Sequence, residues 1–172
     1  KNDWSGLLSD LDTLDSTSSN NRHTEVIKKV QGLIGRVGDT SNLILDPDLD
    51  SYYLMDIVIL RLPNVLEDLA VLRGTTAGVI DRGKLTENRK ADVIGKLVIA
   101  RKGIEDTARR MAVAFENNAT LKPLLETAIN DFVSKANVMV TDTERLLQGD
   151  IEEMDAQAAF KTGSNAIAAG YA

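Results

Sequence analysis

A hydrophobic run at residues 52–60 restricts the fold of this chain more than any other feature of its sequence. Asp56 is the only charged residue in these nine successive positions. Because an α-helix completes a turn every 3.6 residues, such a run places apolar side chains on every face of a helix. A helix of this kind has to be enclosed by other parts of the protein. The run therefore predicts helices that pack into a bundle.

The rest of the chain repeats apolar residues at the spacing of one helix face, and no useful length alternates with the period of a β-strand. We therefore predict an all-α fold, an elongated up-down antiparallel helical bundle with a four-helix core and additional terminal helices. Residues 1–172 are expected to form a single domain. The predicted segments are a short helix over 2–16, a polar linker over 16–21, and longer helices over about 24–46, 47–82, 86–117, 120–149 and beyond 150.

Proline and glycine mark the predicted helix boundaries. Asp46 is expected to cap a helix that starts at Pro47, because proline suits the first helical position and disfavours helix at the residue before it. Pro63 lies inside that helix, where its missing N–H predicts a kink about one turn earlier. Three glycines at steps of three predict either close approach of another backbone or a hinge; they are Gly32, Gly35 and Gly38.

The composition argues against several functional classes. Twenty basic residues against 26 acidic ones give a formal charge of −6, which is unfavourable for a nucleic-acid-binding surface. The chain has no cysteine and a single histidine, His23, so histidine-based triads, thiol catalysis and zinc hydrolysis lack their residues. We therefore predict that the chain is not an enzyme, that it uses no cofactor and that it holds no metal.

A calcium loop is the one metal site that the residue pattern suggests. Asp46, Asp48 and Asp50 have the spacing of its opening, but Ser51 stands where the turn glycine belongs and Ile57 where the bidentate glutamate belongs. Helix capping and the helix dipole already account for aspartates in a first turn. This weighs against calcium.

Asp56 is the centre of the candidate binding site. A charged carboxylate held away from water needs a cation, hydrogen-bond donors or a ligand. One interpretation is that Arg36, Ser41 or Asn42 satisfies it on a facing helix. The other is that the same region lines a small-molecule pocket between helices. The candidate ligand-binding residues are Asp56, Tyr52, Tyr53, Ser41, Asn42, Arg36 and Arg61, with Arg73, Arg109 and Arg110 as further candidate cations.

A family resemblance is carried by the stretch from Ser41 to Asp56, Ser-Asn-Leu-Ile-Leu-Asp-Pro-Asp-Leu-Asp-Ser-Tyr-Tyr-Leu-Met-Asp, and by Arg61-Leu62-Pro63 after it. This stretch resembles the all-helical extracytoplasmic sensor domains of bacterial transmembrane histidine kinases and chemoreceptors. A looser likeness runs through residues 114–118 and 160–171, so that the resemblance spans most of residues 22–171.

The resemblance implies a ligand-sensing input domain of a bacterial membrane receptor. It does not distinguish a kinase, a methyl-accepting or a cyclase output, and among these we expect a sensor histidine kinase. It further implies a periplasmic domain of an inner-membrane protein, attached through flanking segments outside this sequence, and a homodimer in the full-length receptor. The ligand would be a small molecule of unknown identity that shifts one helix against its neighbours. The alternatives are a methyl-accepting chemotaxis receptor and a purely structural or partner-binding helical module.

Overall fold

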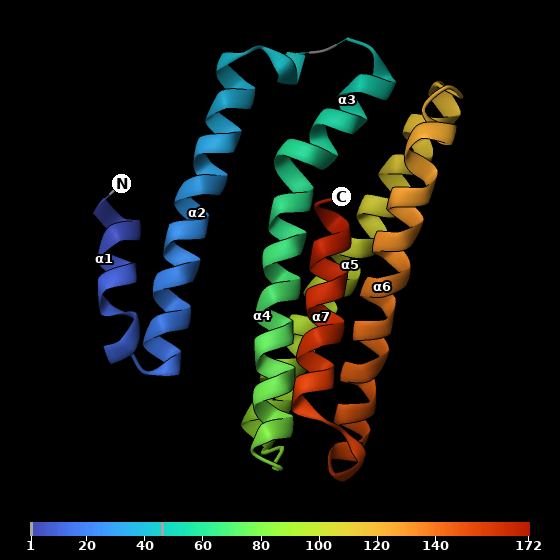
Figure 1. Cartoon of the computed structure of the whole chain (residues 1–172). Helices are drawn as coiled ribbons and strands as arrows, with labels where there is room; N and C mark the ends of the chain where they lie inside the picture. Colours follow the sequence, from blue (N-terminus) through green and yellow to red (C-terminus); the bar gives the residue numbers. More distant parts are fainter. Residues whose placement is uncertain (1, 46) are drawn as a thin grey trace. The chain divides into compact units, whose positions relative to one another are not determined.

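The computed structural model describes residues 2–45 and 47–172 as helices connected by short turns (Figure 1). Its contacts divide the chain into two compact units, residues 1–45 and 46–172, and each unit is described by itself. No β-strand occurs in the described residues, and the predicted all-α class is confirmed. The single domain expected over residues 1–172 stays a prediction.

The first unit consists of α1 (Asn2–Asp10), the 3-10 turn η1 (Leu11–Thr13), α2 (Ser16–Thr40) and the 3-10 turn η2 (Leu43–Leu45). The predicted polar linker over 16–21 is wrong, because these residues form the first turns of α2. Asp15 caps this helix, and its Oδ1 accepts hydrogen bonds from the backbone N–H groups of Thr17 at 2.9 Å and Ser18 at 3.0 Å. A satisfied N-terminus stabilises helix in a segment whose polar residues alone indicate a loop.

The second unit holds the predicted four-helix core. Its first pass is a continuous helical path, made of α3 (Leu49–Met55), the π-helix η3 (Asp56–Arg61) and α4 (Leu62–Asp81). The later passes are α5 (Glu87–Asn117), α6 (Lys122–Gln148) and α7 (Ala156–Gly170), with the 3-10 turn η4 (Asp150–Glu153) before the last. Figure 1 shows these passes alternating in direction, and α7 packs against both α6 and α4. The up-down bundle is confirmed.

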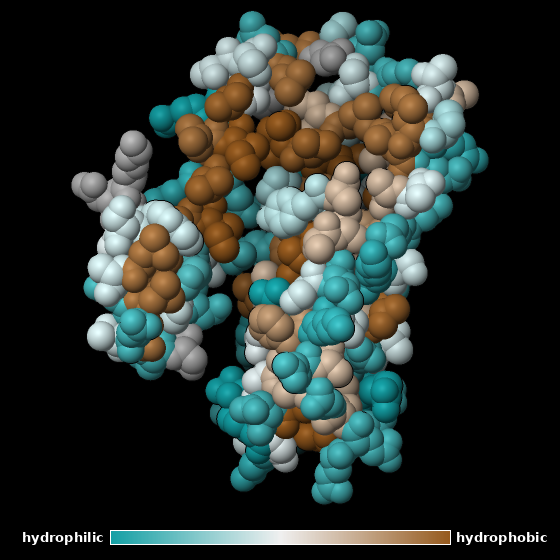
Figure 2. All heavy atoms as spheres, in the orientation of Figure 1, coloured by the Kyte–Doolittle hydropathy of each residue, from teal (hydrophilic) through white to brown (hydrophobic). Residues whose placement is uncertain are grey.

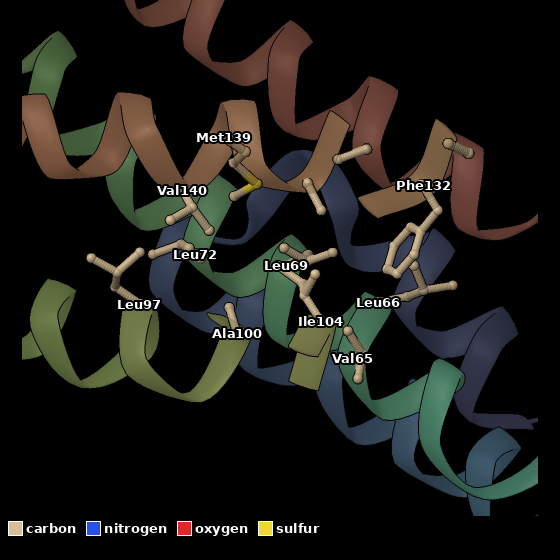
Figure 3. Close-up of a cluster of buried hydrophobic side chains, with 13 residues drawn as sticks. Val65, Leu66, Leu69, Leu72, Leu97, Ala100, Ile104, Phe132, Met139 and Val140 are labelled. Carbon is tan, nitrogen blue, oxygen red and sulfur yellow. The ribbon is translucent and has the colours of Figure 1, made fainter. Parts of the chain in front are cut away.

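The residues that α5 contributes to the core of this unit recur at alternating intervals of four and three residues. These buried residues are Val93, Leu97, Ala100, Ile104, Thr107, Met111 and Ala114. Ile94 and Val98, which neighbour this stripe on the same helix, are exposed. Figure 3 shows α5 residues meeting Leu69 and Leu72 of α4 and Met139 and Val140 of α6.

Several helix ends lie where the sequence places them. The Thr86 side chain accepts a hydrogen bond from the N–H of Arg89 at the start of α5, and α5 ends at Asn117. Gly83 and Gly149 end α4 and α6 with left-handed φ angles of 60° and 108°. Asp46, the predicted cap, lies outside the described residues, and α3 begins at Leu49 rather than at Pro47.

The helix that contains Pro63 is interrupted as predicted. A π-helix covers residues 56–61, and α3 is inclined to α4 at this point in Figure 1. Proline has no N–H to donate to the carbonyl four residues earlier, and this loosens the preceding turn. The expectation that residues 52–60 are enclosed on every side is wrong, because Tyr52, Val58 and Leu60 are exposed. α3 packs mainly against α5, so one side of this segment is not covered by the unit.

Close backbone approach occurs at glycines of the second unit. At Gly32 and Gly35 no atom of another segment comes within 4 Å of the place that a Cβ would occupy, so close approach does not explain these two. At Gly103 a Cβ would lie 2.7 Å from Val65 Cγ2, and at Gly170 it would lie even closer to Leu66 Cδ2. The core packing of α4 therefore requires glycine on α5 and α7.

We expect Gly103→Ala to lower the free energy of unfolding by about 1–3 kcal/mol, because the added methyl group overpacks the core against Val65. Gly95→Ala is the matched control on the same helix, where nothing lies within 4 Å of the new methyl group. This variant should raise the free energy of unfolding by about 0.5–1 kcal/mol. Urea unfolding of both variants measures these changes. Equal changes in the two variants would contradict the close packing at Gly103.

Candidate ligand site

Asp56 is buried, as predicted, with a relative exposure of 3%. It stands at the junction of α3 and η3, and two arginines satisfy its carboxylate. Arg61 Nε donates a hydrogen bond to Oδ2 over 3.0 Å, and Arg110 Nη1 of α5 donates to the same oxygen over 2.7 Å. A buried carboxylate that forms two charge-assisted hydrogen bonds has its desolvation offset by the protein itself.

The same two arginines also bind Asp106. Arg110 Nε lies 3.0 Å and Arg61 Nη1 lies 3.5 Å from Asp106 Oδ2, and Arg109 donates to the other carboxylate oxygen. Hydrogen bonds from Arg109 and Arg110 lower the pKa of Asp106 to about 2. We refer to Asp56, Arg61, Asp106 and Arg110 as the ion cluster.

The π-helix explains why Arg61 reaches Asp56. In an α-helix, a residue five positions later points about 140° away around the helix axis. A π-helix forms hydrogen bonds between residues five apart and therefore brings positions 56 and 61 to the same side. The sequence spacing alone gives no reason to pair these two residues. The pairing depends on the break that Pro63 introduces.

The tyrosines differ in their relation to the ion cluster. The ring of Tyr53 lies under Arg110, whose Cζ is 5.8 Å from the ring centroid. Tyr52 packs edge to face against Tyr53 with ring centroids 5.6 Å apart, and its side chain is exposed. The structure therefore brings together Asp56, Arg61 and Tyr53, with Tyr52 at the edge.

Three predicted site residues belong to the first unit. Arg36 lies in α2, Ser41 is the residue that ends this helix, and Asn42 has a left-handed φ of 59°. All three are exposed, and the Ser41 hydroxyl donates to the Gly38 carbonyl over 3.2 Å. The partners that the structure gives to Asp56 are Arg61 and Arg110 instead. A binding role for Arg36, Ser41 and Asn42 stays a prediction.

A hydrophobic pocket of about 370 Å³ lies beside the ion cluster, between the end of α7 and the segments η3, α4, α5 and α6. Its inner wall includes the buried side chains of Ile57, Leu66, Thr107 and Phe132. Figure 3 shows Leu66 and Phe132 next to each other. The exposed residues Val58 and Tyr171 line its outer part. Asp56, Tyr52 and Tyr53 do not line this pocket, and a ligand-binding role for them stays a prediction.

Consecutive residues connect the pocket to the ion cluster. Asp56 belongs to the cluster and Ile57 lines the pocket. On α5 the same relation joins Asp106 to Thr107 and Arg110 to Met111. Asp106 was missed in the sequence analysis, although its spacing of three and four residues from two arginines on one helix is typical of ion pairs. No comparable pattern of neighbouring residues in the sequence indicates the pocket.

Metal binding and membrane crossing find no support in the described part of the chain. Its His, Cys, Asp and Glu residues form no group that could hold a metal ion. Asp50, from the calcium-like pattern, accepts a hydrogen bond from Asn118 Nδ2 over 2.7 Å, and this bond lowers the pKa of its carboxyl group. No helix in residues 2–45 or 47–172 combines the length and hydrophobicity that a membrane span needs.

Comparison with protein-family models, with curated proteins and with solved structures found no match. The functional interpretation of this chain therefore depends on its residues and their geometry.

Asp56→Asn should lower the free energy of unfolding by about 3 kcal/mol, because it leaves Arg110 partly buried with one carboxylate partner fewer. Asp131→Asn is the matched control, since Asp131 pairs with Lys135 on the exposed face of α6. This control should change the free energy of unfolding by less than about 0.5 kcal/mol. Chemical unfolding at neutral pH measures both. A change below 1 kcal/mol in Asp56→Asn would show that the ion cluster contributes little.

Acid should weaken the fold partly through Asp106. Because the pKa of the folded-state carboxyl is about 2 and that of an unfolded aspartate is about 4, its stabilisation is fully present above about pH 4. It is lost as the pH falls towards 2. We expect the stability of Asp106→Asn to fall less steeply than that of the wild type between pH 4 and 2. Thermal unfolding across this range tests the prediction, and equal slopes would contradict it.

Proposed function

We propose that this chain is the extracytoplasmic ligand-sensing input domain of a bacterial transmembrane receptor, with a sensor histidine kinase as its output. The resemblance of residues 41–63 to such domains supports the proposal, together with the helical bundle. The ligand would be a small molecule bound within the second unit. A chemotaxis receptor would use the same input arrangement.

One observation carries the proposal, namely the alternation of cluster and pocket residues along two helical segments. Asp56 and Ile57 are neighbours in η3, and Arg110 and Met111 are neighbours in α5. A molecule that fills the pocket contacts one member of each pair. Any displacement of these side chains therefore changes the geometry of the ion pairs beside them.

The π-helix provides the element that a ligand would shift. Conversion of η3 to α-helix would move its residues by about one position, which corresponds to a rotation of about 100° and a rise of 1.5 Å per residue. The Asp56–Arg61 pair favours the π form, whereas regular backbone hydrogen bonding favours the α form. A ligand that fits one arrangement better would shift the population towards it by its difference in affinity.

A thermal-shift screen with a varied set of small molecules tests ligand binding by the full chain. A compound at 100 times its dissociation constant should add about 2.7 kcal/mol, and for a chain of this size this raises Tm by roughly 5–10 °C. Hydrogen exchange should then change at η3 and at the end of α7. Asp56→Asn should alter this exchange response, whereas Asp131→Asn should preserve it. A screen without stabilising compounds, or exchange unchanged at η3, would contradict the proposal.

A second function, as a partner-binding helical module, is favoured by hydrophobic residues that remain exposed on α2. They lie within one side of the helix, and they are Ile27, Val30, Leu33 and Val37. Figure 2 shows hydrophobic side chains on the surface of the first unit. The pairing of Asp56 within the protein also agrees with this alternative. This alternative predicts that the chain shows no ligand response. It also predicts that substitution of Val30 or Leu33 by glutamate abolishes association with the partner.

A further inference from the structure

We infer that the pocket beside η3 binds an electrically neutral, mainly hydrocarbon molecule of about 15 non-hydrogen atoms. This inference rests on the proposed ligand-sensing function and names the chemical class of the ligand. The pocket is distinct from the site predicted from the sequence, which is centred on Asp56. Three observations support the inference: the chemistry of the pocket wall, the prior pairing of the nearby charges, and the size of the cavity.

None of the described residues that line the pocket has a charged side chain. The described residues of its buried part are Ile57, Leu66, Met111, Phe132 and Ala169, with Thr107 as the one fully buried polar residue among them. The Thr107 hydroxyl already donates its hydrogen to the Gly103 carbonyl over 2.8 Å. It therefore offers the ligand only acceptor capacity. A charged group placed here would lose its hydration without gaining a partner, and this disfavours its binding.

The charged side chains of the ion cluster, which lie beside this wall, already form ion pairs with one another. Asp56 lies next to Ile57, but its carboxylate accepts from Arg61 and Arg110. Arg110 lies next to Met111, and its guanidinium binds both Asp56 and Asp106. A charged ligand would have to displace an ion pair that is shielded from water. A neutral ligand leaves these pairs intact.

The size of the pocket limits the ligand. A dry apolar cavity of about 150 Å³ in another protein accommodates benzene, with six non-hydrogen atoms. Scaling to a volume of about 370 Å³ gives about 15 such atoms. Two fused or linked aromatic rings, or a compact terpene-like hydrocarbon, fall in this range. The volume also lies within the usual range for small-molecule sites.

A pair of fluorescent probes tests the ligand class. N-phenyl-1-naphthylamine is neutral and of suitable size, and 1-anilinonaphthalene-8-sulfonate has the same rings with an added sulfonate. In titrations of the full chain, the neutral probe should bind saturably with one site per chain. The sulfonate should bind at least tenfold more weakly. Similar affinities for the two probes would overturn the inference, since they indicate unspecific adsorption to exposed apolar residues.

Two substitutions locate the bound probe. Ala128→Trp fills part of the pocket and should weaken binding of the neutral probe at least tenfold, whereas Ala91→Trp, at an exposed position of α5, should leave it unchanged. Circular dichroism checks the folding of each variant, and Ala128→Leu provides a smaller filling substitution if the tryptophan variant does not fold. Retention of binding in a folded Ala128 variant would overturn the inference. Weaker probe binding at higher protein concentration would do the same, because it indicates that a second copy covers the pocket.

The outcomes separate this inference from the proposed function. A charged compound that stabilises the wild type, loses its effect in Asp56→Asn and is indifferent to Ala128→Trp would overturn the ligand class and leave sensing intact. Binding of the neutral probe in the pocket without altered hydrogen exchange at η3 would support the ligand class and contradict the sensing mechanism. Both failures together would leave only the helical fold.

Discussion

The pairing of the buried Asp56 carboxylate is the interaction on which the candidate site depends. An ionised group in this position has to recover its lost hydration from fixed partners, and it does so from two directions. Arg61 comes from its own helical segment, and Arg110 comes from α5. Because α3 packs mainly against α5, the Asp56–Arg110 pair and the contact of Arg110 with Tyr53 attach this end of the first pass to the bundle.

The π-helix and the ion pair depend on each other. Pro63 cannot donate the hydrogen bond that a regular helix requires, and the local unwinding brings Asp56 and Arg61 to one side. Regular α-helix would recover better backbone geometry but would separate the two charges. A charge-assisted hydrogen bond contributes of the order of 1–3 kcal/mol, which is comparable to that of a backbone hydrogen bond.

Local signals in the sequence were sufficient for some elements and insufficient for others. Thr86, Gly149 and Pro63 act on their own backbone, and the features that they predict are present. The start of α2 was missed because the cap at Asp15 outweighs the polar residues after it. The partner of Asp56 could not be selected, because Arg110 is 54 residues away and several other arginines met the same criterion. The pocket was unpredictable because it depends on small residues of α7, among them Ala169 and Gly170, meeting the larger side chains of other helices.

The pocket lies next to the ion cluster along the chain, and this adjacency supports the sensing proposal over a purely structural ion pair. Three successive pairs of residues, 56–57, 106–107 and 110–111, each place one member in the cluster and the other in the pocket wall. In the sensing proposal, a ligand would act on the wall, and the backbone would transmit any displacement to the charged neighbour over a single residue. Ion pairs are sensitive to small changes in distance and direction when they are shielded from water. The proposal therefore expects occupancy of the hydrophobic pocket to change the electrostatic energy at the π-helix, without contact between the ligand and a charged group.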